Sequence, residues 1–179
     1  MKVLKNDFEF LKTISLEFFE QEYIVEKLNK FSLNEIKGWE IWLQVEFALF
    51  LFQHSKVAKV EREKRYELDK RKSEDKDICS IDFLIREKNK HTAIPLEIKQ
   101  HYQISSCIRY MLKDIDKYEK VRSSSMDTGR SLWCLGVHPT PENDDYLTRV
   151  INENKFRELY EEFIFSKSIK GTSFSFTII

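Results

Sequence analysis

Two carboxylates and a lysine occur on two neighbouring predicted strands. Asp82 interrupts the apolar run ICSIDFLI, and Glu97 and Lys99 belong to the next apolar run, AIPLEIK. Because side chains along a strand alternate between its two faces, Glu97 and Lys99 point to the same face, opposite to their apolar neighbours. A hairpin formed by the two runs can place Asp82 on that face as well, a short distance from Glu97.

This cluster is suited to chemistry on a phosphate. Two adjacent carboxylates repel each other and raise each other's pKa, and a hard divalent cation such as Mg²⁺ removes that repulsion. A bound metal lowers the pKa of a water molecule and stabilises charge on a phosphate. Lys99 adds a fixed positive charge beside the same water. Asp82, Glu97 and Lys99 therefore predict hydrolysis of a phosphodiester, although an E-x-K triplet on a strand is also common as a surface ion pair.

Glu46 is a further candidate for the site. A helical wheel places it among Trp39, Trp42, Leu43 and Phe50, and a carboxylate within an apolar face costs several kcal/mol unless a partner compensates it. Either a cation elsewhere in the fold pairs with Glu46, or Glu46 faces the metal site across the interface between helix and sheet. Glu40, on the same helix, shares a more polar side with Gln44 and is predicted to be solvated.

The hydrophobic pattern predicts the elements that must position these residues. Residues 1–37 form an N-terminal helical segment, and the helix 39–53 is apolar almost all round, which predicts burial between other elements. The run SLWCLGV is continuously apolar, as in a central strand covered on both faces. The remaining predicted elements are a strand at 57–68, a charged turn at 69–77, a helix at 104–118, a helix from 143 or 144 to 165, and a strand at 174–179. The expected fold is a single α/β domain, 1–179, with a mixed β-sheet flanked by α-helices.

Composition excludes little. The chain has 179 residues with 30 basic and 30 acidic side chains, and a balanced total neither supports nor excludes binding to nucleic acid. Cys79, Cys107 and Cys134 lack the spacing of a zinc site and are predicted to be reduced thiols in the core. The N-terminus lacks the apolar stretch of a signal peptide, and the run FALFLF is too short to cross a bilayer. We therefore expect a cytoplasmic protein that does not associate with membranes.

The order of these residues resembles a known family. An acid on a helix, Asp82 on a strand and Glu97-Ile98-Lys99 on the next strand is similar to the PD-(D/E)XK nucleases, and the resemblance covers roughly Trp39 to Val137. The resemblance implies a restriction-endonuclease-like core and DNA as the substrate in preference to RNA. Two features depart from the family: Ile81 replaces the proline before the aspartate, and no clear counterpart is present of the Gln–Tyr pair found in some exonuclease branches.

The resemblance also implies roles for single residues. Asp82, Glu97 and the carbonyl group of Ile98 would bind Mg²⁺ or Mn²⁺, and Lys99 would orient or activate the attacking water. Glu46 would take the place of the helical acid, which binds the metal directly or through water. Gln100, directly after the lysine, would contact phosphate or water.

Basic side chains near the motif could bind the nucleic acid backbone. Lys113 and Lys117 lie on the helix after the motif, although interleaved acids allow the alternative of an ordinary solvated face. His101 either contacts phosphate or has an ordinary surface role. The first hypothesis is thus a metal-dependent nuclease, acting as a homodimer or within a larger complex. The alternative is a non-catalytic binding or regulatory subunit with a nuclease fold, for example in a defence or phage complex.

Overall fold

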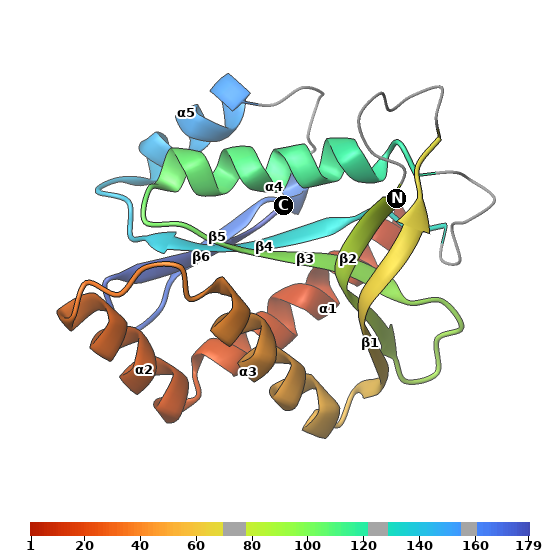
Figure 1. Ribbon diagram of the computed structural model, residues 1–179, viewed down its shortest axis with the longest axis horizontal. Helices are drawn as coiled ribbons and strands as arrows, with labels where there is room; N and C mark the ends of the chain where they lie inside the picture. Colours follow the sequence, from red (N-terminus) through yellow and green to blue (C-terminus); the bar gives the residue numbers. More distant parts are fainter. Residues whose placement is uncertain (70–77, 122–128, 155–160) are drawn as a thin grey trace.

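The computed structural model describes residues 1–69, 78–121, 129–154 and 161–179. These residues form an α/β protein with five α-helices and a six-stranded mixed sheet in the order β1-β2-β3-β4-β6-β5. Figure 1 shows three layers, with α1, α2 and α3 on one face of the sheet and α4 and α5 on the other. The charged turn predicted at 69–77 lies, apart from its first residue, outside the described part of the chain.

The predicted order of helices and strands is confirmed up to α5. The helices are α1 (Lys2–Phe19), α2 (Glu22–Leu33), α3 (Glu40–Gln53), α4 (Ile104–Tyr118) and α5 (Asp144–Asn154). The strands are β1 (Val57–Glu67), β2 (Ile78–Glu87), β3 (Ile94–Gln100), β4 (Trp133–Pro139), β5 (Phe165–Ser168) and β6 (Phe174–Ile178). The N-terminal helices belong to the core, because Phe8 of α1 packs against Trp133 of β4 and Phe19 of α1 stacks on Phe176 of β6.

Strand β4 is central, as its sequence predicted. It pairs in parallel with β3 and antiparallel with β6, and all its residues except Pro139 are buried. Helix α4 makes the connection between the parallel strands β3 and β4, as parallel pairing requires. The hairpin predicted between β2 and β3 is also present, with Phe83 paired with Leu96.

The C-terminal part differs from the prediction. We expected a helix as far as Phe165, but α5 is described for Asp144–Asn154, Glu161–Phe163 form a 3₁₀ helix, and Phe165 begins strand β5. Residues 155–160 lie outside the described ranges. Strand β5 pairs with the free edge of β6, and the Phe165 ring lies 5.7 Å from that of Phe176. Pairing with the sheet edge and aromatic packing therefore override the local helical pattern.

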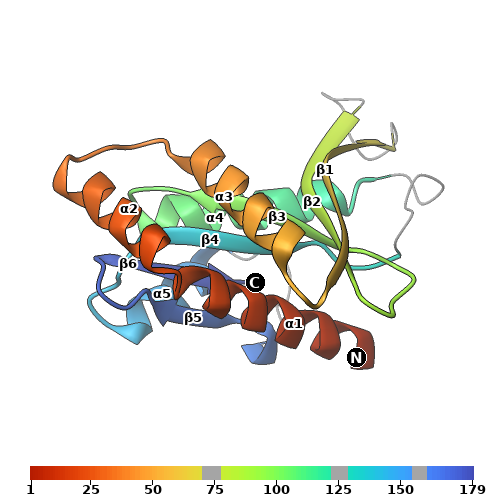
Figure 2. The ribbon, with the colours of Figure 1, turned by 90° about the horizontal axis from the view of Figure 1, so that it is seen from below.

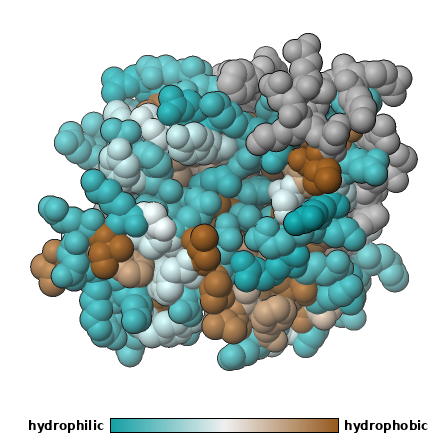
Figure 3. All heavy atoms as spheres, viewed as in Figure 1, coloured by the Kyte–Doolittle hydropathy of each residue, from teal (hydrophilic) through white to brown (hydrophobic). Residues whose placement is uncertain are grey.

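Helix α3 is only half covered, although its composition predicted burial on all sides. Leu43, Phe47 and Leu51 are buried against the core. The opposite side exposes a row of apolar side chains, and Figure 3 shows this apolar band along α3. The row consists of Ile41, Val45, Leu49 and Phe52.

The cysteines and the helix lengths agree with the sequence-based expectations. All three cysteines are buried and form no disulfide. Burial raises the pKa of Cys107 to about 12, which keeps this thiol protonated at neutral pH. None of the described helices combines the length and the apolar character needed to span a membrane.

Gly136 allows α4 to approach the sheet closely. A Cβ atom at this position would lie 2.3 Å from Met111 Sδ and 2.9 Å from Cys107 Sγ, both on α4. Gly136 is also the partner of Lys99 in the register between β3 and β4. The missing side chain therefore brings α4 close to the strand that carries the motif.

We predict that Gly136→Val lowers the free energy of unfolding by about 1–3 kcal/mol, the usual cost of overpacking a core. Chemical denaturation followed by circular dichroism measures the change. Gly136→Ala combined with Met111→Ala is the compensating control, and the two changes should cost less together than the sum of the single variants. An unchanged midpoint for Gly136→Val would contradict this account of the packing.

Candidate functional site

The candidate site begins where β2 separates from β3. The ladder between the two strands runs from the pair Ile85–Ile94 to the pair Phe83–Leu96. Before this point β2 continues alongside β1, and Figure 2 shows these two strands bending away from the rest of the sheet. Glu63 lies on β1 between Arg62 and Lys64, which pair with Phe83 and Ile81 of β2, and it has a positive φ of 54°. A glutamate in this conformation is uncommon, and such strain is often found at functional sites.

Two carboxylates occupy the edge of β3 that β2 leaves free. Asp82 Oδ2 accepts a hydrogen bond of 2.8 Å from the backbone N–H of Ile98. Glu40 Oε2 accepts one of 2.9 Å from the backbone N–H of Gln100. Side chains thus replace the missing strand as partners for backbone donors. The N–H and C=O groups of a strand residue point to the same side, so the Ile98 carbonyl group also faces this edge.

Lys99 is surrounded by carboxylates. Its Nζ atom lies 2.9 Å from Asp114 Oδ2, 3.2 Å from Glu97 Oε2 and 4.0 Å from Glu40 Oε1. The Lys99 side chain is only 18% exposed. These acids come from β3, from α4 on one face of the sheet and from α3 on the other, so three elements converge on a single ammonium group.

The cluster contains more carboxyl groups than ammonium groups, and the pKa values of Glu97, Asp82 and Glu40 are raised. Burial and the neighbouring charge of Asp82 raise the pKa of Glu97 to about 9. Burial also raises the pKa of Asp82 and of Glu40. The hydrogen bonds that these carboxylates accept from backbone N–H groups act in the opposite direction and lower the pKa. Burial alone would lower the pKa of Lys99, but the Glu97 and Asp114 carboxylates outweigh it and raise that pKa, so Lys99 remains a cation. The charge of Asp82 also acts on the Glu97 carboxyl group and adds to the effect of burial on its pKa.

The structure brings together most of the predicted motif but places Glu46 elsewhere. Asp82, Glu97, Ile98 and Lys99 form one cluster. Glu46 lies on the side of α3 that faces α2, where its charge raises the pKa of Tyr23, second to the effect of burial. Among the described residues, no hydrogen bond or ion pair joins Glu46 to the cluster. Two expectations are therefore corrected. Glu46 does not face the site, and Glu40, on the same helix, is not simply solvated.

The correction has a physical reason. Both sides of α3 carry apolar residues, so a helical wheel alone does not show which side packs against the sheet. Glu40 and Gln44 continue the row of Phe47 and Leu51, at the spacing i, i+4, i+7 and i+11. That row is the buried one, and Gln44 itself is buried. The regular spacing of Glu40 with core residues is the signal that could have identified it.

Asp114 was not predicted to belong to the site. The sequence suggested an exposed acid on a solvated helix, yet Asp114 forms the shortest ion pair of Lys99. It lies three residues after Met111 and four before Tyr118, both buried. A charged residue at helical spacing from two core positions lies beside the apolar stripe, and this spacing was the available signal.

The predicted nucleic-acid contacts lie around the cluster. Lys113 is exposed on α4, one residue before Asp114. Lys117 is partly buried and lies close enough to β2 to influence the Cys79 thiol. Gln100 is buried, with its N–H group bound to Glu40, so little of its side chain is available to a ligand.

The residues present fit a hard cation that keeps part of its water shell. Within the described ranges, no group of three or more His, Cys, Asp or Glu side chains is arranged to hold a metal ion. Mg²⁺, however, is commonly bound by only one or two carboxylates together with water and substrate phosphates. Asp82 and Glu97 could supply two oxygen ligands and the Ile98 carbonyl group a third. Burial raises the pKa of both carboxyl groups, so a bound cation would favour their charged forms.

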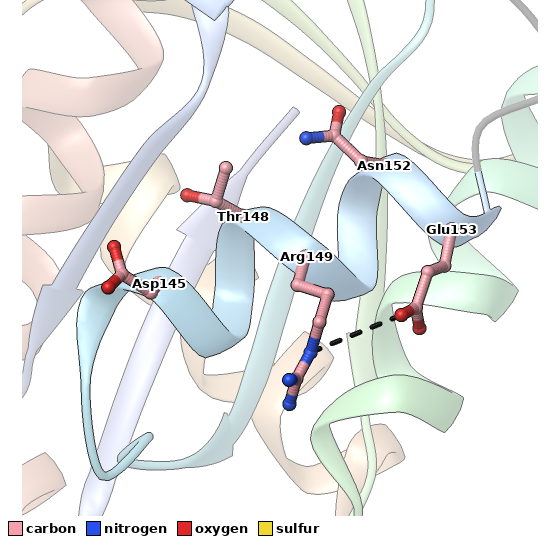
Figure 4. Close-up of a pocket in the computed structure, with 5 residues that line it drawn as sticks. All are labelled: Asp145, Thr148, Arg149, Asn152 and Glu153. Atoms are coloured by element: carbon pink, nitrogen blue, oxygen red, sulfur yellow. Dashed lines mark ion pairs between the residues drawn. The ribbon is translucent and has the colours of Figure 1, made fainter.

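Comparison with known proteins adds no family. The chain matches no family model, no curated protein and no solved structure. Elsewhere on the surface, a hollow is lined by five side chains of α5, where Arg149 pairs with Glu153 at 4.0 Å (Figure 4). All five belong to one exposed helix and none to the cluster, so the candidate site remains at the separation of β2 and β3.

The raised pKa of Glu97 predicts how stability depends on pH in EDTA. The folded protein keeps this proton up to about pH 9, whereas an unfolded glutamate loses it near its ordinary pKa of 4.5. The folded state therefore binds more protons in this window, and the free energy of unfolding should fall as pH rises, by at most about 1.4 kcal/mol per pH unit for one proton. Urea denaturation across this range measures the slope. Glu97→Gln should flatten it, and an equal slope in wild type and variant would contradict the assignment.

Proposed function

We propose that this chain is a metal-dependent nuclease of the PD-(D/E)XK type that hydrolyses phosphodiester bonds in DNA. The observation that carries the proposal is the hydrogen bond from the Ile98 N–H group to Asp82, because it fixes the carboxylate of one strand beside the residue between Glu97 and Lys99. The mixed sheet with helices on both faces is compatible with a restriction-endonuclease-like core, and the parallel β3–α4–β4 unit follows the motif as the resemblance implies.

The acid on the helix is Glu40 in this proposal. It lies on α3, the last helix before the strands, at the position in the chain order where the resemblance expects an acid, and it contacts both β3 and Lys99. When bound by Asp82, Glu97 and the Ile98 carbonyl group, Mg²⁺ or Mn²⁺ would supply a hydroxide-like water and charge stabilisation at the phosphate. Glu40 would contribute to binding the metal through its Oε1 atom, which lies 4.0 Å from Lys99 Nζ, directly or through water.

Lys99 acts as a fixed positive charge. Its raised pKa means that the ammonium group holds its proton at neutral pH, so it does not serve as a general base. A buried ammonium group held by carboxylates is preorganised, and such groups stabilise developing negative charge with little reorganisation. Lys99 can therefore orient the attacking water and stabilise charge on the phosphate in the transition state.

One observation favours the non-catalytic alternative. The Lys99 ammonium group already pairs with three acids, so the cluster is partly neutralised without any metal. A structural network of this kind would suit a binding or regulatory subunit. The two functions differ in whether the cluster accelerates cleavage, which the variants below test.

We predict that Lys99→Gln lowers the rate of metal-dependent DNA cleavage by roughly a hundredfold or more, the usual effect of losing a positioned electrostatic group. Single-stranded circles and plasmid DNA, incubated with Mg²⁺, with Mn²⁺ or with EDTA, are the substrates. Circular dichroism in the presence of Mg²⁺ confirms folding, because removing the lysine leaves its acids uncompensated when no metal is present. A folded variant that cuts at the rate of wild type would refute the role of Lys99. No cleavage by wild type with either metal would favour the non-catalytic subunit.

We predict opposite results for two matched variants of α3. Glu40→Gln should weaken stabilisation by Mg²⁺ and lower cleavage at least tenfold, since it alters a group that contacts Lys99 and β3. Glu46→Gln should leave both unchanged. The melting temperature with and without Mg²⁺, measured beside cleavage rates, separates a role in the site from a general loss of stability. Greater loss in Glu46→Gln than in Glu40→Gln would restore Glu46 to the site.

A further inference from the structure

Exposed aromatic rings gather where β3 leads into α4. The His101 ring stacks on Tyr102, with centroids 4.5 Å apart and planes inclined by 23°. It also meets the ring of Tyr110 edge-on, at a centroid distance of 5.7 Å. Tyr102 is 52% exposed and Tyr110 is 41% exposed. Rings that are packed against one another yet open to solvent form a preordered surface, called here the aromatic platform (His101, Tyr102 and Tyr110).

Positive charges lie over this platform. Lys37 Nζ is 4.7 Å from the centroid of the Tyr102 ring, and Arg109 Cζ is 5.5 Å from that of Tyr110. Lys113 follows Arg109 by one helical turn on α4 and is exposed. The cations come from two segments, the connection between α2 and α3 and helix α4. Exposed aromatic rings flanked by cations are the combination that binds single-stranded nucleic acid, because bases stack on rings while cations attract the phosphates.

The platform is continuous with the candidate site. Tyr102 follows Lys99 by three residues, so their Cα atoms are at most about 11 Å apart along the chain. Lys37 precedes Glu40 by three residues, and Glu40 bonds to the N–H group of Gln100, next to His101. Both segments that form the platform therefore also supply groups to the carboxylate cluster. A strand lying on the platform would have its next phosphate beside that cluster.

Resting on the nuclease function proposed above, we infer that the aromatic platform binds unpaired bases and that the preferred substrate is single-stranded DNA, or an unpaired segment beside a duplex. In a duplex the bases stack on one another and are not available to Tyr102 and Tyr110, so a duplex gains only the contacts of its phosphates. The preference therefore depends on stacking and not on charge alone.

Binding measured without cleavage tests the inference. Fluorescence anisotropy in EDTA compares a short fluorescein-labelled DNA strand of mixed sequence with the same strand annealed to its complement. Wild type should bind the single strand roughly tenfold more tightly, and Tyr102→Ala or Tyr110→Ala should weaken that binding roughly five- to hundredfold, the range for loss of one stacked base. Duplex binding should hardly change. Tyr102→Phe keeps the ring and should bind as wild type does.

Tyr23→Ala is the matched control, because Tyr23 is 44% exposed on α2 and lies outside both the platform and the cluster. It should bind both ligands as wild type does. Equal affinity for single strand and duplex, or unchanged single-strand binding in Tyr102→Ala and Tyr110→Ala, would overturn the inference. Binding of an RNA strand of the same sequence with no binding of the DNA strand would overturn the choice of DNA. These outcomes do not depend on cleavage, so failure of the nuclease function is recognised separately.

Discussion

The separation of β2 from β3 directly after the pair Phe83–Leu96 is the constraint on which the candidate site depends. A strand that loses its neighbour leaves backbone donors and acceptors without partners, and burying them unpaired costs free energy. Here two of these donors, on Ile98 and Gln100, are taken by Asp82 and Glu40. The same two hydrogen bonds satisfy backbone donors at the sheet edge and hold two carboxylates in fixed positions. The stability of the fold and the geometry of the site therefore depend on the same interactions.

Fixing carboxylates at this edge creates a charge problem that the rest of the structure must answer. Asp82 lies close enough to Glu97 to raise its pKa, and Glu40 and Asp114 add further acids around Lys99. Burial raises the pKa of Asp82 and of Glu97, and the single ammonium group of Lys99 only partly opposes this effect, so these two carboxyl groups retain protons at higher pH than usual. Either retained protons or a bound divalent cation would offset the excess of negative charge at the cluster. The arrangement would therefore suit a metal ion that exchanges with solvent.

The sequence was sufficient for the parts of the fold and site that follow from periodicity. The alternation along Ile94–Gln100 placed Glu97 and Lys99 on one face, and the continuous apolar run identified β4 as central. The sequence-based prediction was wrong where the position of a residue depended on the packing of one element against another. Both sides of α3 are apolar, so only the position of the sheet decides that Glu40 faces inward and Glu46 does not. Strand β5 likewise forms because β6 offers a free edge, which no local pattern around Phe165 reveals.

In the proposed function, the end of β3 would join the carboxylate cluster to the aromatic platform in a single element. After Lys99, the N–H group of His101 still bonds to the Val137 carbonyl group of β4, at 3.1 Å. The strand is therefore anchored to the centre of the sheet up to the first ring of the aromatic platform. On the opposite edge of β3, the hydrogen bond from the Gln100 N–H group to Glu40 holds the connection that carries Lys37 close to the same strand. Rings and carboxylates held by one strand cannot move far relative to each other, so a base stacked on the platform would determine which phosphate reaches Lys99. Selection of the substrate would then follow from the position of β3.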